Sequence, residues 1–189
     1  MLKDLILKNR SYRRFEEKRD VSKDILVELI DLGRLSPSGA NKQPLKYYLS
    51  SDQETNEKIF STLAWAAYLK DWEGPIAGER PSAYIVILGD KEISDKFGVD
   101  PGIAAQSILL GATEKGLGGC MFGSVAREKL RKLLDIPSKF EILYVLAIGY
   151  PIEKVQIDIV NESGSIKYWR DKSQVHHVPK RSLSELIVS

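Results

Sequence analysis

The chain has 189 residues, of which 43% are hydrophobic and 29% are charged. This balance is typical of a folded globular protein, and the length accommodates one domain with a substantial core. The formal net charge of +2 is too close to neutral for the bulk attraction that drives nucleic-acid binding. A single cysteine, Cys120, excludes an internal disulfide and cannot hold a metal ion or an iron–sulfur cluster alone.

No apolar run approaches the roughly 18 residues that suggest a membrane-spanning helix. The first residues are charged from Lys3 and Asp4 onward, so they lack the uninterrupted apolar stretch of a signal peptide. We therefore expect a soluble, cytoplasmic protein.

The first half of the chain predicts three helices and one strand. A short apolar helix begins at Leu2 and ends near Asn9. Ser22 is a good N-cap for a second helix, whose apolar residues share one face through Gly33. Residues 36–41 favour turns, a strand covers 47–49, and a polar, helix-prone segment covers 52–63.

The second half predicts two buried strands between helices. The continuous apolar runs 84–88 and 142–148 are typical of buried strands. Asp100 as N-cap and Pro101 at the first helical position open a helix that is apolar nearly all round and ends at Gly116. Residues 118–123 form a short strand or turn, and 127–134 form another helix. Helices that separate a few strands indicate an α+β sandwich with a mixed or antiparallel sheet.

Two segments do not fit regular elements. Residues 64–81 contain Trp65, Tyr68 and Trp72, and we interpret them as a helix end followed by a mobile, aromatic-rich excursion. Residues 152–189 are polar and irregular, yet they carry aromatic side chains and a final apolar set. A tail without a core of its own is expected to wrap a second copy of the chain. The prediction is thus one domain, 1–189, with 152–189 as a C-terminal arm.

A basic cluster follows the first helix. Arg10, Ser11, Arg13 and Arg14 combine rigid guanidinium forks with a hydroxyl donor, which suits a phosphate monoester. Taken alone, a basic cluster is more often a solvated surface.

Residues 37–44, Pro-Ser-Gly-Ala-Asn-Lys-Gln-Pro, bring amide side chains to short spacing. Such groups both donate and accept hydrogen bonds, as the imide edge of a flavin or a nucleobase requires; alone, they are also typical of a turn before a strand. The neighbours His176 and His177 would point to opposite faces of an extended chain, so we expect no metal site there. Cys120 is expected to be packed rather than nucleophilic, and the residues supply no catalytic acid–base pair.

The order of the motifs along the chain resembles the nitroreductase family. Arg-Ser-x-Arg-x-Phe follows the first helix, and Pro-Ser-x-x-Asn-x-Gln-Pro comes about one helix later. Gly-Leu-Gly then ends the apolar helix, Gly-Tyr-Pro closes a buried strand, and Pro-Lys-Arg precedes a final short helix. The resemblance spans nearly the whole chain.

The resemblance implies an α/β/α sandwich with a mainly antiparallel sheet, in a domain-exchanged homodimer that binds two molecules of flavin mononucleotide (FMN) between the subunits. It also implies four groups of flavin-binding residues, each with its own part of the cofactor. Arg10, Ser11 and Arg13 would hold the phosphate, the ribityl chain and the pyrimidine side; Pro37, Ser38 and Asn41 would approach from the second subunit, with Gln43 in the same motif; Gly123 and Ser124 would place backbone groups near flavin N5; Lys180 and Arg181 would close on the phosphate. Asn9 replaces a frequent family arginine.

The function implied is a ping-pong oxidoreductase. Hydride passes from NADH or NADPH to FMN, and then to a flat, electron-poor acceptor such as a nitroaromatic or a quinone. Trp65, Tyr68 and Trp72 are candidates for a lid and substrate wall, or else for packing in the dimer core.

Three alternatives stay open at this point. One is a specialised flavoenzyme of the same fold, such as a dehalogenase, an azoline-type dehydrogenase or a flavin-fragmenting enzyme. Another is a non-catalytic flavin- or nucleotide-binding module. A basic nucleic-acid binder would use the same arginines but would leave the 37–44 segment and the long tail unexplained.

Overall fold

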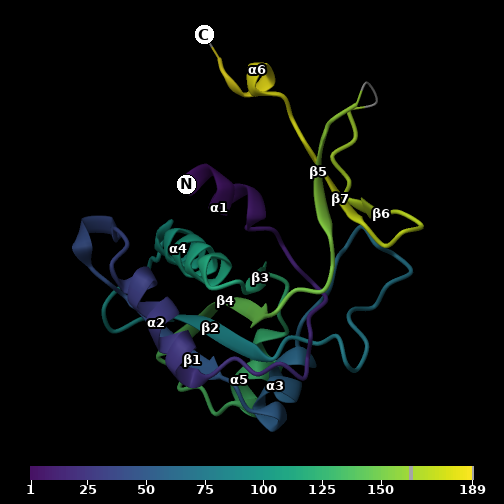
Figure 1. Ribbon diagram of the computed structural model, residues 1–189. Coiled ribbons are helices and arrows are strands. Elements are labelled where there is room, and N and C mark those ends of the chain that lie inside the picture. Colours follow the sequence, from purple (N-terminus) through teal and green to yellow (C-terminus); the bar gives the residue numbers. More distant parts are fainter. Residues whose placement is uncertain (162–163, 189) are drawn as a thin grey trace.

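An antiparallel sheet with strand order β1-β2-β4-β3 forms the centre of the computed structural model, which describes residues 1–161 and 164–188 (Figure 1). The strands are β1 (Leu45–Ser50), β2 (Ala83–Asp90), β3 (Gly118–Phe122) and β4 (Phe140–Gly149). Every residue of β2 is buried, because β2 is an inner strand and helices cover both of its faces. That burial explains why its sequence is a continuous apolar run rather than an alternating pattern.

Two pairs of helices sandwich this sheet. Helices α2 (Lys23–Arg34) and α4 (Asp100–Glu114) cover one face, where Leu29 and Ile108 belong to one core cluster with Ile85. Helices α3 (Gln53–Phe60) and α5 (Arg127–Leu133) cover the other face, where Ile59 and Leu130 form a second cluster. Helix α1 (Leu2–Lys8) lies beside α4 (Figure 1). The prediction of an α+β sandwich with an antiparallel sheet is confirmed.

The observed ends of α2 and α4 can be compared with the helix start and stop residues expected from the sequence. Ser22 caps α2 as expected, because its Oγ accepts the Ile25 N–H at 3.3 Å. Gly116 follows α4 with φ +75°, a left-handed conformation that glycine adopts without steric cost. The prediction for Asp100 is wrong: α4 begins at Asp100 itself, after Val99. The Asp100 carboxylate instead accepts hydrogen bonds from Ser38 and Gly39 of the 37–44 segment.

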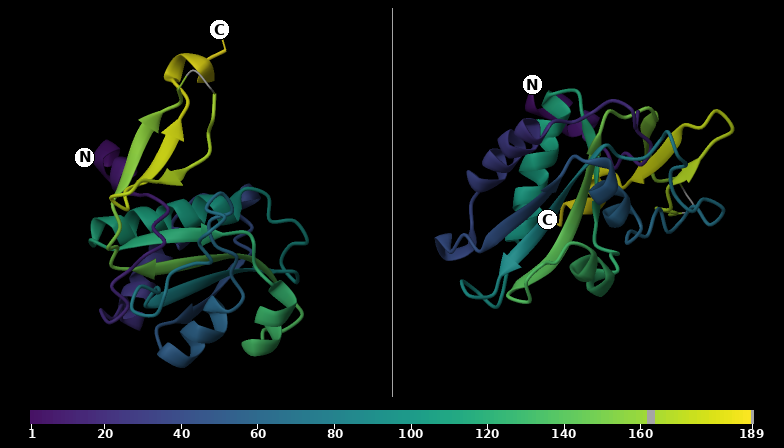
Figure 2. Two further views of the ribbon diagram at one scale, coloured as in Figure 1. Left: turned by 90° about the vertical axis from the view of Figure 1, so that its right-hand side faces the viewer. Right: turned by 90° about the horizontal axis from the view of Figure 1, so that it is seen from below.

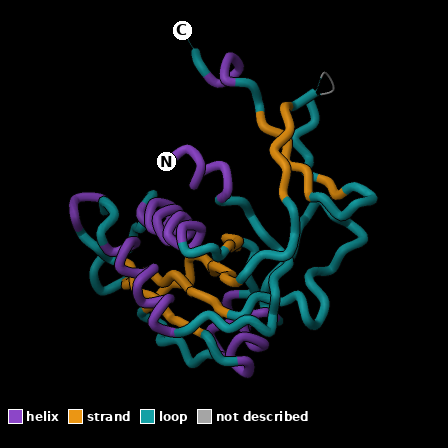
Figure 3. Tube along the Cα trace, viewed as in Figure 1, coloured by secondary structure: helices purple, strands orange, loops and turns teal. Residues whose placement is uncertain are grey.

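Residues 64–81 form turns without a helix or a strand (Figure 3). The expectation that they begin with a helix end is wrong, because α3 ends at Phe60 and is capped by Ser61. Trp65 packs against the α3/α5 face, with its ring centroid 4.6 Å from Phe122 and 5.6 Å from Phe60. Aromatic packing and backbone hydrogen bonds, such as the one from the Phe15 N–H to the Glu79 carbonyl at 2.9 Å, therefore tie this segment to the body without a helix or a strand.

The C-terminal arm, which we expected to be irregular, contains a small sheet of its own. Its elements are β5 (Val155–Ile159), β6 (Trp169–Arg170), β7 (His176–Lys180) and α6 (Leu183–Leu186). Strand β7 pairs in parallel with β5 and antiparallel with β6. The arm stands out from the body, with α6 at its far end (Figures 1 and 2). Residues 162–163 and Ser189 of the predicted arm lie outside the described part of the chain.

None of the helices in the described residues is long and apolar enough to cross a membrane.

Candidate functional site

A cavity of about 400 Å³ opens where the segment after α1 meets α4, β3 and the arm. The segment after α1 contributes Arg10, Ser11 and Arg13, and β7 contributes Lys180. Residues separated by about 170 positions in the sequence are thus brought to one place. Of the predicted flavin-binding residues, these four line the cavity together.

The cations at this cavity lack anionic partners. Within residues 1–161 and 164–188, no carboxylate oxygen lies within 4.0 Å of a side-chain nitrogen of Arg10, Arg13 or Lys180. Arg10 donates through one terminal nitrogen to the Ile6 carbonyl at 2.6 Å, while its buried Nε–H has no partner among the described residues. Uncompensated guanidinium and ammonium groups around one cavity favour an anionic ligand.

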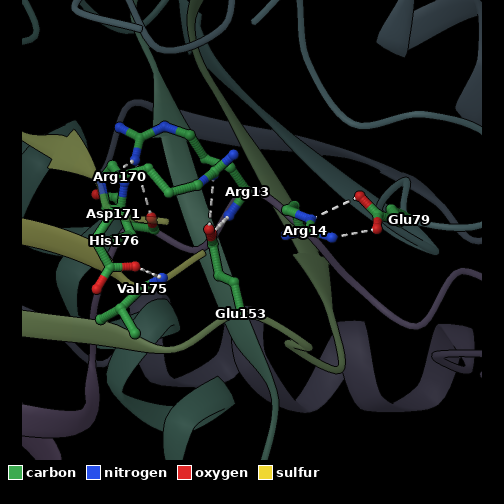
Figure 4. Close-up of polar contacts among 9 residues, drawn as sticks. Arg13, Arg14, Glu79, Glu153, Arg170, Asp171, Val175 and His176 are labelled. Atoms are coloured by element: carbon green, nitrogen blue, oxygen red, sulfur yellow. Dashed lines mark hydrogen bonds and ion pairs between the residues drawn. The ribbon is translucent and has the colours of Figure 1, made fainter. Parts of the chain in front are cut away.

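A buried network behind the cavity holds Arg13 in place (Figure 4). The side chain of Glu153 is completely buried, accepts the backbone N–H of Arg13 and pairs with Arg170 at 3.1 Å. The Arg13 guanidinium lies over the Tyr168 ring, 5.0 Å from the centroid of that ring. Sequence reasoning missed Glu153, Tyr168 and Arg170, because a lone acid and scattered residues in a polar tail carry no recognisable spacing.

His176 completes this network. Its Nε2 lies 3.3 Å from a terminal nitrogen of Arg13. Burial, together with the nearby charges of Arg13 and Arg170, lowers the pKa of His176 to about 4. The imidazole is therefore neutral at pH 7 and accepts a hydrogen bond from Arg13 instead of repelling it.

The segment 37–44 lies in a different part of the structure, beside the start of α4. Ser38 Oγ donates to Asp100 Oδ2 at 2.6 Å, and the Gly39 N–H donates to Oδ1 at 2.9 Å. Three residues that are not glycine have positive φ angles, namely Ala40 (49°), Asn41 (52°) and Gln43 (52°). Such conformations cost about 1–3 kcal/mol each and concentrate at functional sites.

This segment does not reach the cations within one chain. Pro37, Ser38 and Gln43 instead line a separate cavity of about 150 Å³ together with Asp100. Asn41 accepts a hydrogen bond from the Gln43 amide at 3.2 Å and is exposed.

Three other predicted binding residues also lie outside the lining of the larger cavity. The Ser124 carbonyl accepts the Ala64 N–H at 3.1 Å, and the Gly123 carbonyl accepts a hydrogen bond from Arg127. Arg181 is paired with Glu185 at 3.5 Å within the arm. Lys180 and Arg181 are adjacent but differ in their surroundings. Lys180 lines the cavity, whereas Arg181 forms an ion pair with Glu185.

The predicted substrate residues connect the 64–81 segment to the arm. The Tyr68 ring lies 4.9 Å from the Tyr168 ring, and the Tyr68 N–H donates to the Tyr168 hydroxyl at 3.3 Å. Trp72 lies 4.8 Å from the Arg170 guanidinium. Tyr68 thus contacts Tyr168, which lines the cavity, and Trp72 contacts Arg170 behind it, whereas Trp65 packs on the opposite face of the sheet.

Cys120 and His177 were considered above as a nucleophile and as a metal ligand. Cys120 is buried, and burial raises the pKa of its thiol to about 11, so the prediction that it is packed is confirmed. His177 stacks on Trp169 and lies 2.7 Å from an Asp158 oxygen. No group of three or more potential metal ligands occurs in the part of the chain that the structure describes.

The profile of the nitroreductase family matches residues 6–150 of this chain. The chain belongs to the nitroreductase family. The predicted resemblance is therefore confirmed, and the chain is an oxidoreductase-family enzyme. The matched region contains the basic segment, the 37–44 segment and all four strands of the main sheet.

Individual relatives agree with this assignment. A protein of Archaeoglobus fulgidus with the provisional name NADH dehydrogenase/NAD(P)H nitroreductase is 28% identical over 155 residues, which cover 78% of this chain and 83% of that protein. An iodotyrosine deiodinase of Thermotoga neapolitana is 26% identical over 169 residues, 80% of this chain and 89% of that one. The solved structure of an FMN-dependent nitroreductase from Clostridium difficile R20291 is 26% identical, with a TM-score of 0.64 over 85% of this chain and 92% of that chain.

Proposed function

We propose that this nitroreductase-family protein is an FMN-dependent oxidoreductase that works as a homodimer. It takes hydride from NADH or NADPH and passes it, in a ping-pong sequence, to a flat electron-poor acceptor such as a nitroaromatic or a quinone. The observation that carries the proposal is the cavity lined by Arg10, Arg13 and Lys180, which lack a carboxylate partner in the described residues. The names of the Archaeoglobus and Clostridium relatives support the donor and the cofactor.

The residues at the cavity fit FMN by their chemistry. A phosphate monoester needs charge-assisted donors, and the buried Nε–H of Arg10 is a donor without a hydrogen-bond partner in the described part of the chain. The volume of about 400 Å³ lies within the range of small-molecule and cofactor sites. At Gly102, which lines the cavity from the first turn of α4, an added Cβ would meet nothing within 4 Å. The backbone there is open to close approach by a ligand.

The role of the protein's own residues would be to bind FMN and to orient it. Arg10 and Lys180 hold the phosphate, with Ser11 as an additional donor. Arg13, fixed by Glu153 and neutral His176, presents positive charge where negative charge develops during hydride transfer, which lowers the barrier. FMN, when bound, supplies the two-electron chemistry, so the protein needs no nucleophile or acid–base pair of its own.

The site is completed by a second copy of the chain. Pro37, Ser38, Asn41 and Gln43 come from the partner, and this accounts for a strained polar segment that does not reach the cations of its own chain. The backbone at Gly123 and Ser124 would lie beside the flavin ring, and Arg181 would join Lys180 in holding the phosphate.

The arm, 152–189, wraps the partner in a domain-exchanged dimer. Supporting this, α6 stands away from the body (Figure 2), and Leu183 and Leu186 are 72% and 63% exposed in the single chain. Apolar side chains gathered on an extended arm need a surface to cover them. Tyr68 and Trp72 would form a wall against which a flat acceptor could stack, with Trp65 anchoring the wall to the body.

An absorbance spectrum of the freshly purified protein, before and after anaerobic NADH and NADPH, tests the proposal. Visible flavin bands that bleach on addition, in a protein that elutes as a dimer, are the expected result. A colourless protein that FMN cannot reconstitute would refute it.

The deiodinase relative favours one second candidate, a reductive dehalogenase of an aromatic substrate. The two functions differ in their oxidative half-reactions. Chemically reduced protein that is reoxidised by a halogenated tyrosine, but not by nitroaromatics or quinones, would select the dehalogenase.

A further inference from the structure

A second cavity, of about 430 Å³, lies away from the candidate flavin site. Its walls are α3, the start of β2 and two loops, residues 17–20 and 77–82. Tyr84, which lines it, belongs to the core cluster on the α3/α5 face of the sheet. The candidate flavin site is instead lined by α4 on the other face. The two cavities therefore do not share walls.

Three buried polar groups at this second cavity have no hydrogen-bond partner in the described residues. They are Arg80 Nε, Ser82 Oγ and the Tyr84 hydroxyl. Tyr84 is completely buried and Ser82 is 7% exposed. A buried polar group without a partner costs about 1–3 kcal/mol, and three around one cavity indicate that something in the cavity satisfies them. One water occupies only about 30 Å³, so a cavity of this size admits a larger polar molecule.

The surroundings keep these groups in place. The Arg80 guanidinium lies 4.4 Å from the Phe60 ring centroid and 3.5 Å from a Glu57 oxygen. Glu17 accepts the backbone N–H groups of Gly78 and Arg80 through one oxygen, Oε2. Within residues 1–161 and 164–188, the Arg80 Nε–H and the second carboxylate oxygens of Glu17 and Glu57 have no hydrogen-bond partner.

The Tyr84 hydroxyl is a donor at every physiological pH. Burial raises the pKa of Tyr84, and the charges of Arg80, Glu17 and Glu57 all act on it. The Tyr84 hydroxyl therefore stays protonated and is able to donate a hydrogen bond to a ligand.

The charges around the cavity select a neutral ligand. The lining contains two cations, Lys18 and Arg80, and three carboxylates, Glu17, Asp20 and Glu57. An anion would meet the excess of carboxylates, and a cation would leave the buried Nε–H and hydroxyl donors without an acceptor. A hydroxyl group meets both requirements, because it accepts from one side and donates to the other.

We propose that this cavity binds a small, neutral, polyhydroxylated molecule of the carbohydrate or cyclitol class. Its hydroxyl oxygens accept hydrogen bonds from Arg80 Nε, Ser82 and Tyr84, and its hydroxyl protons are donated to Glu17 and Glu57. The site is separate from the proposed flavin site and needs neither FMN nor a nicotinamide.

The test is a saturation-transfer NMR titration of the purified full-length protein with D-glucose and myo-inositol. Acetate and ethylammonium serve as the charged comparison compounds. Saturable binding of at least one polyol, with weaker or no binding of both ions, is expected. Tyr84→Phe keeps the buried ring and removes one donor, so the polyol Kd should rise about tenfold. Tyr48→Phe is the matched control, because Tyr48 packs against the same cluster without lining the cavity.

Other outcomes overturn the inference. Binding that is equal in Tyr84→Phe and Tyr48→Phe places the polyol elsewhere, and tighter binding of acetate contradicts the charge argument. A crystal soaked in the polyol that holds only ordered water at Tyr84 also refutes it. Ser82→Ala provides a second variant that removes a single atom, should Tyr84→Phe not fold, and the same tenfold loss is expected.

Discussion

Replacing Glu153 with alanine should destabilise this protein more than removing any exposed carboxylate. The Glu153 side chain is 0% exposed, and its partner Arg170 is 10% exposed. Truncation leaves a buried guanidinium without its counter-charge and removes the acceptor for the Arg13 N–H. Breaking a buried pair from one side costs about 3–5 kcal/mol. We expect the free energy of unfolding to fall by about that amount, a large part of the 5–15 kcal/mol typical of a domain.

Urea denaturation followed by circular dichroism measures this difference. Protein and FMN concentrations must be held constant, because the proposed dimerisation and cofactor binding would both raise apparent stability. Glu28→Ala is the matched control: Glu28 pairs with Lys115 at 2.5 Å, but the two side chains are 59% and 38% exposed. A surface pair contributes about 0–1 kcal/mol.

A second readout separates loss of stability from loss of the site. Glu153→Gln keeps an oxygen that accepts the Arg13 N–H but loses the charge facing Arg170. It should lie between the wild type and Glu153→Ala in stability, and FMN affinity should fall in the same order because Arg13 is held less firmly. If Glu153→Ala unfolds at the same urea concentration as Glu28→Ala, the reasoning about the buried pair is wrong.

Three further predictions follow from the site. Arg10→Ala should weaken FMN binding about 10- to 100-fold, since it removes a charge-assisted contact; flavin fluorescence titration of the apoprotein measures this, and unchanged affinity would exclude Arg10 from the phosphate site. Asp100→Asn should weaken the hydrogen bond from the Gly39 N–H and lower FMN affinity without unfolding the chain, as judged by circular dichroism; full affinity would show that the loop needs no such anchor. Because the folded pKa of His176 is about 4 against an ordinary 6.5, the unfolded chain binds a proton between these values that the folded chain does not. The free energy of unfolding should therefore fall as pH drops from about 6.5 toward 4, by up to about 1.4 kcal/mol per pH unit, and His176→Gln should show a smaller slope in urea melts at pH 7, 6 and 5.

Sequence patterns predicted the body well, because its signals are local. The apolar run 84–88 predicts a buried strand, and Ser22 predicts the start of a helix, each from a few neighbouring residues. Both predictions are confirmed. The error at Asp100 shows the limit of local reasoning. Aspartate before proline is a typical helix start, but the carboxylate is used 62 residues away, at Ser38.

The arm was harder to predict for a different reason. Strand β5 reads Val-Gln-Ile-Asp-Ile and alternates apolar and polar residues, but its partner β7 reads His-His-Val-Pro-Lys and does not, and the paired residues are 21 positions apart. An alternation of only five residues, with a partner strand that lacks it, is a weak signal for a sheet. The site shares this difficulty, because Arg10 and Lys180 lie together only after the arm has folded back toward α4.

The strand order has a consequence for synthesis of the chain. Strand β4 pairs with β2 on one side and with β3 on the other, yet it is the last of the four strands of the main sheet to be made. A growing chain that ends before Phe140 can form the antiparallel pairing of β1 with β2, but β3 has no neighbouring strand in the main sheet. Because chains grow at about 5–20 residues per second, Cys120 and the apolar side chains near it remain uncovered for the seconds needed to add β4. Ribosome-bound chains of this protein should therefore need protection from aggregation most over that short interval.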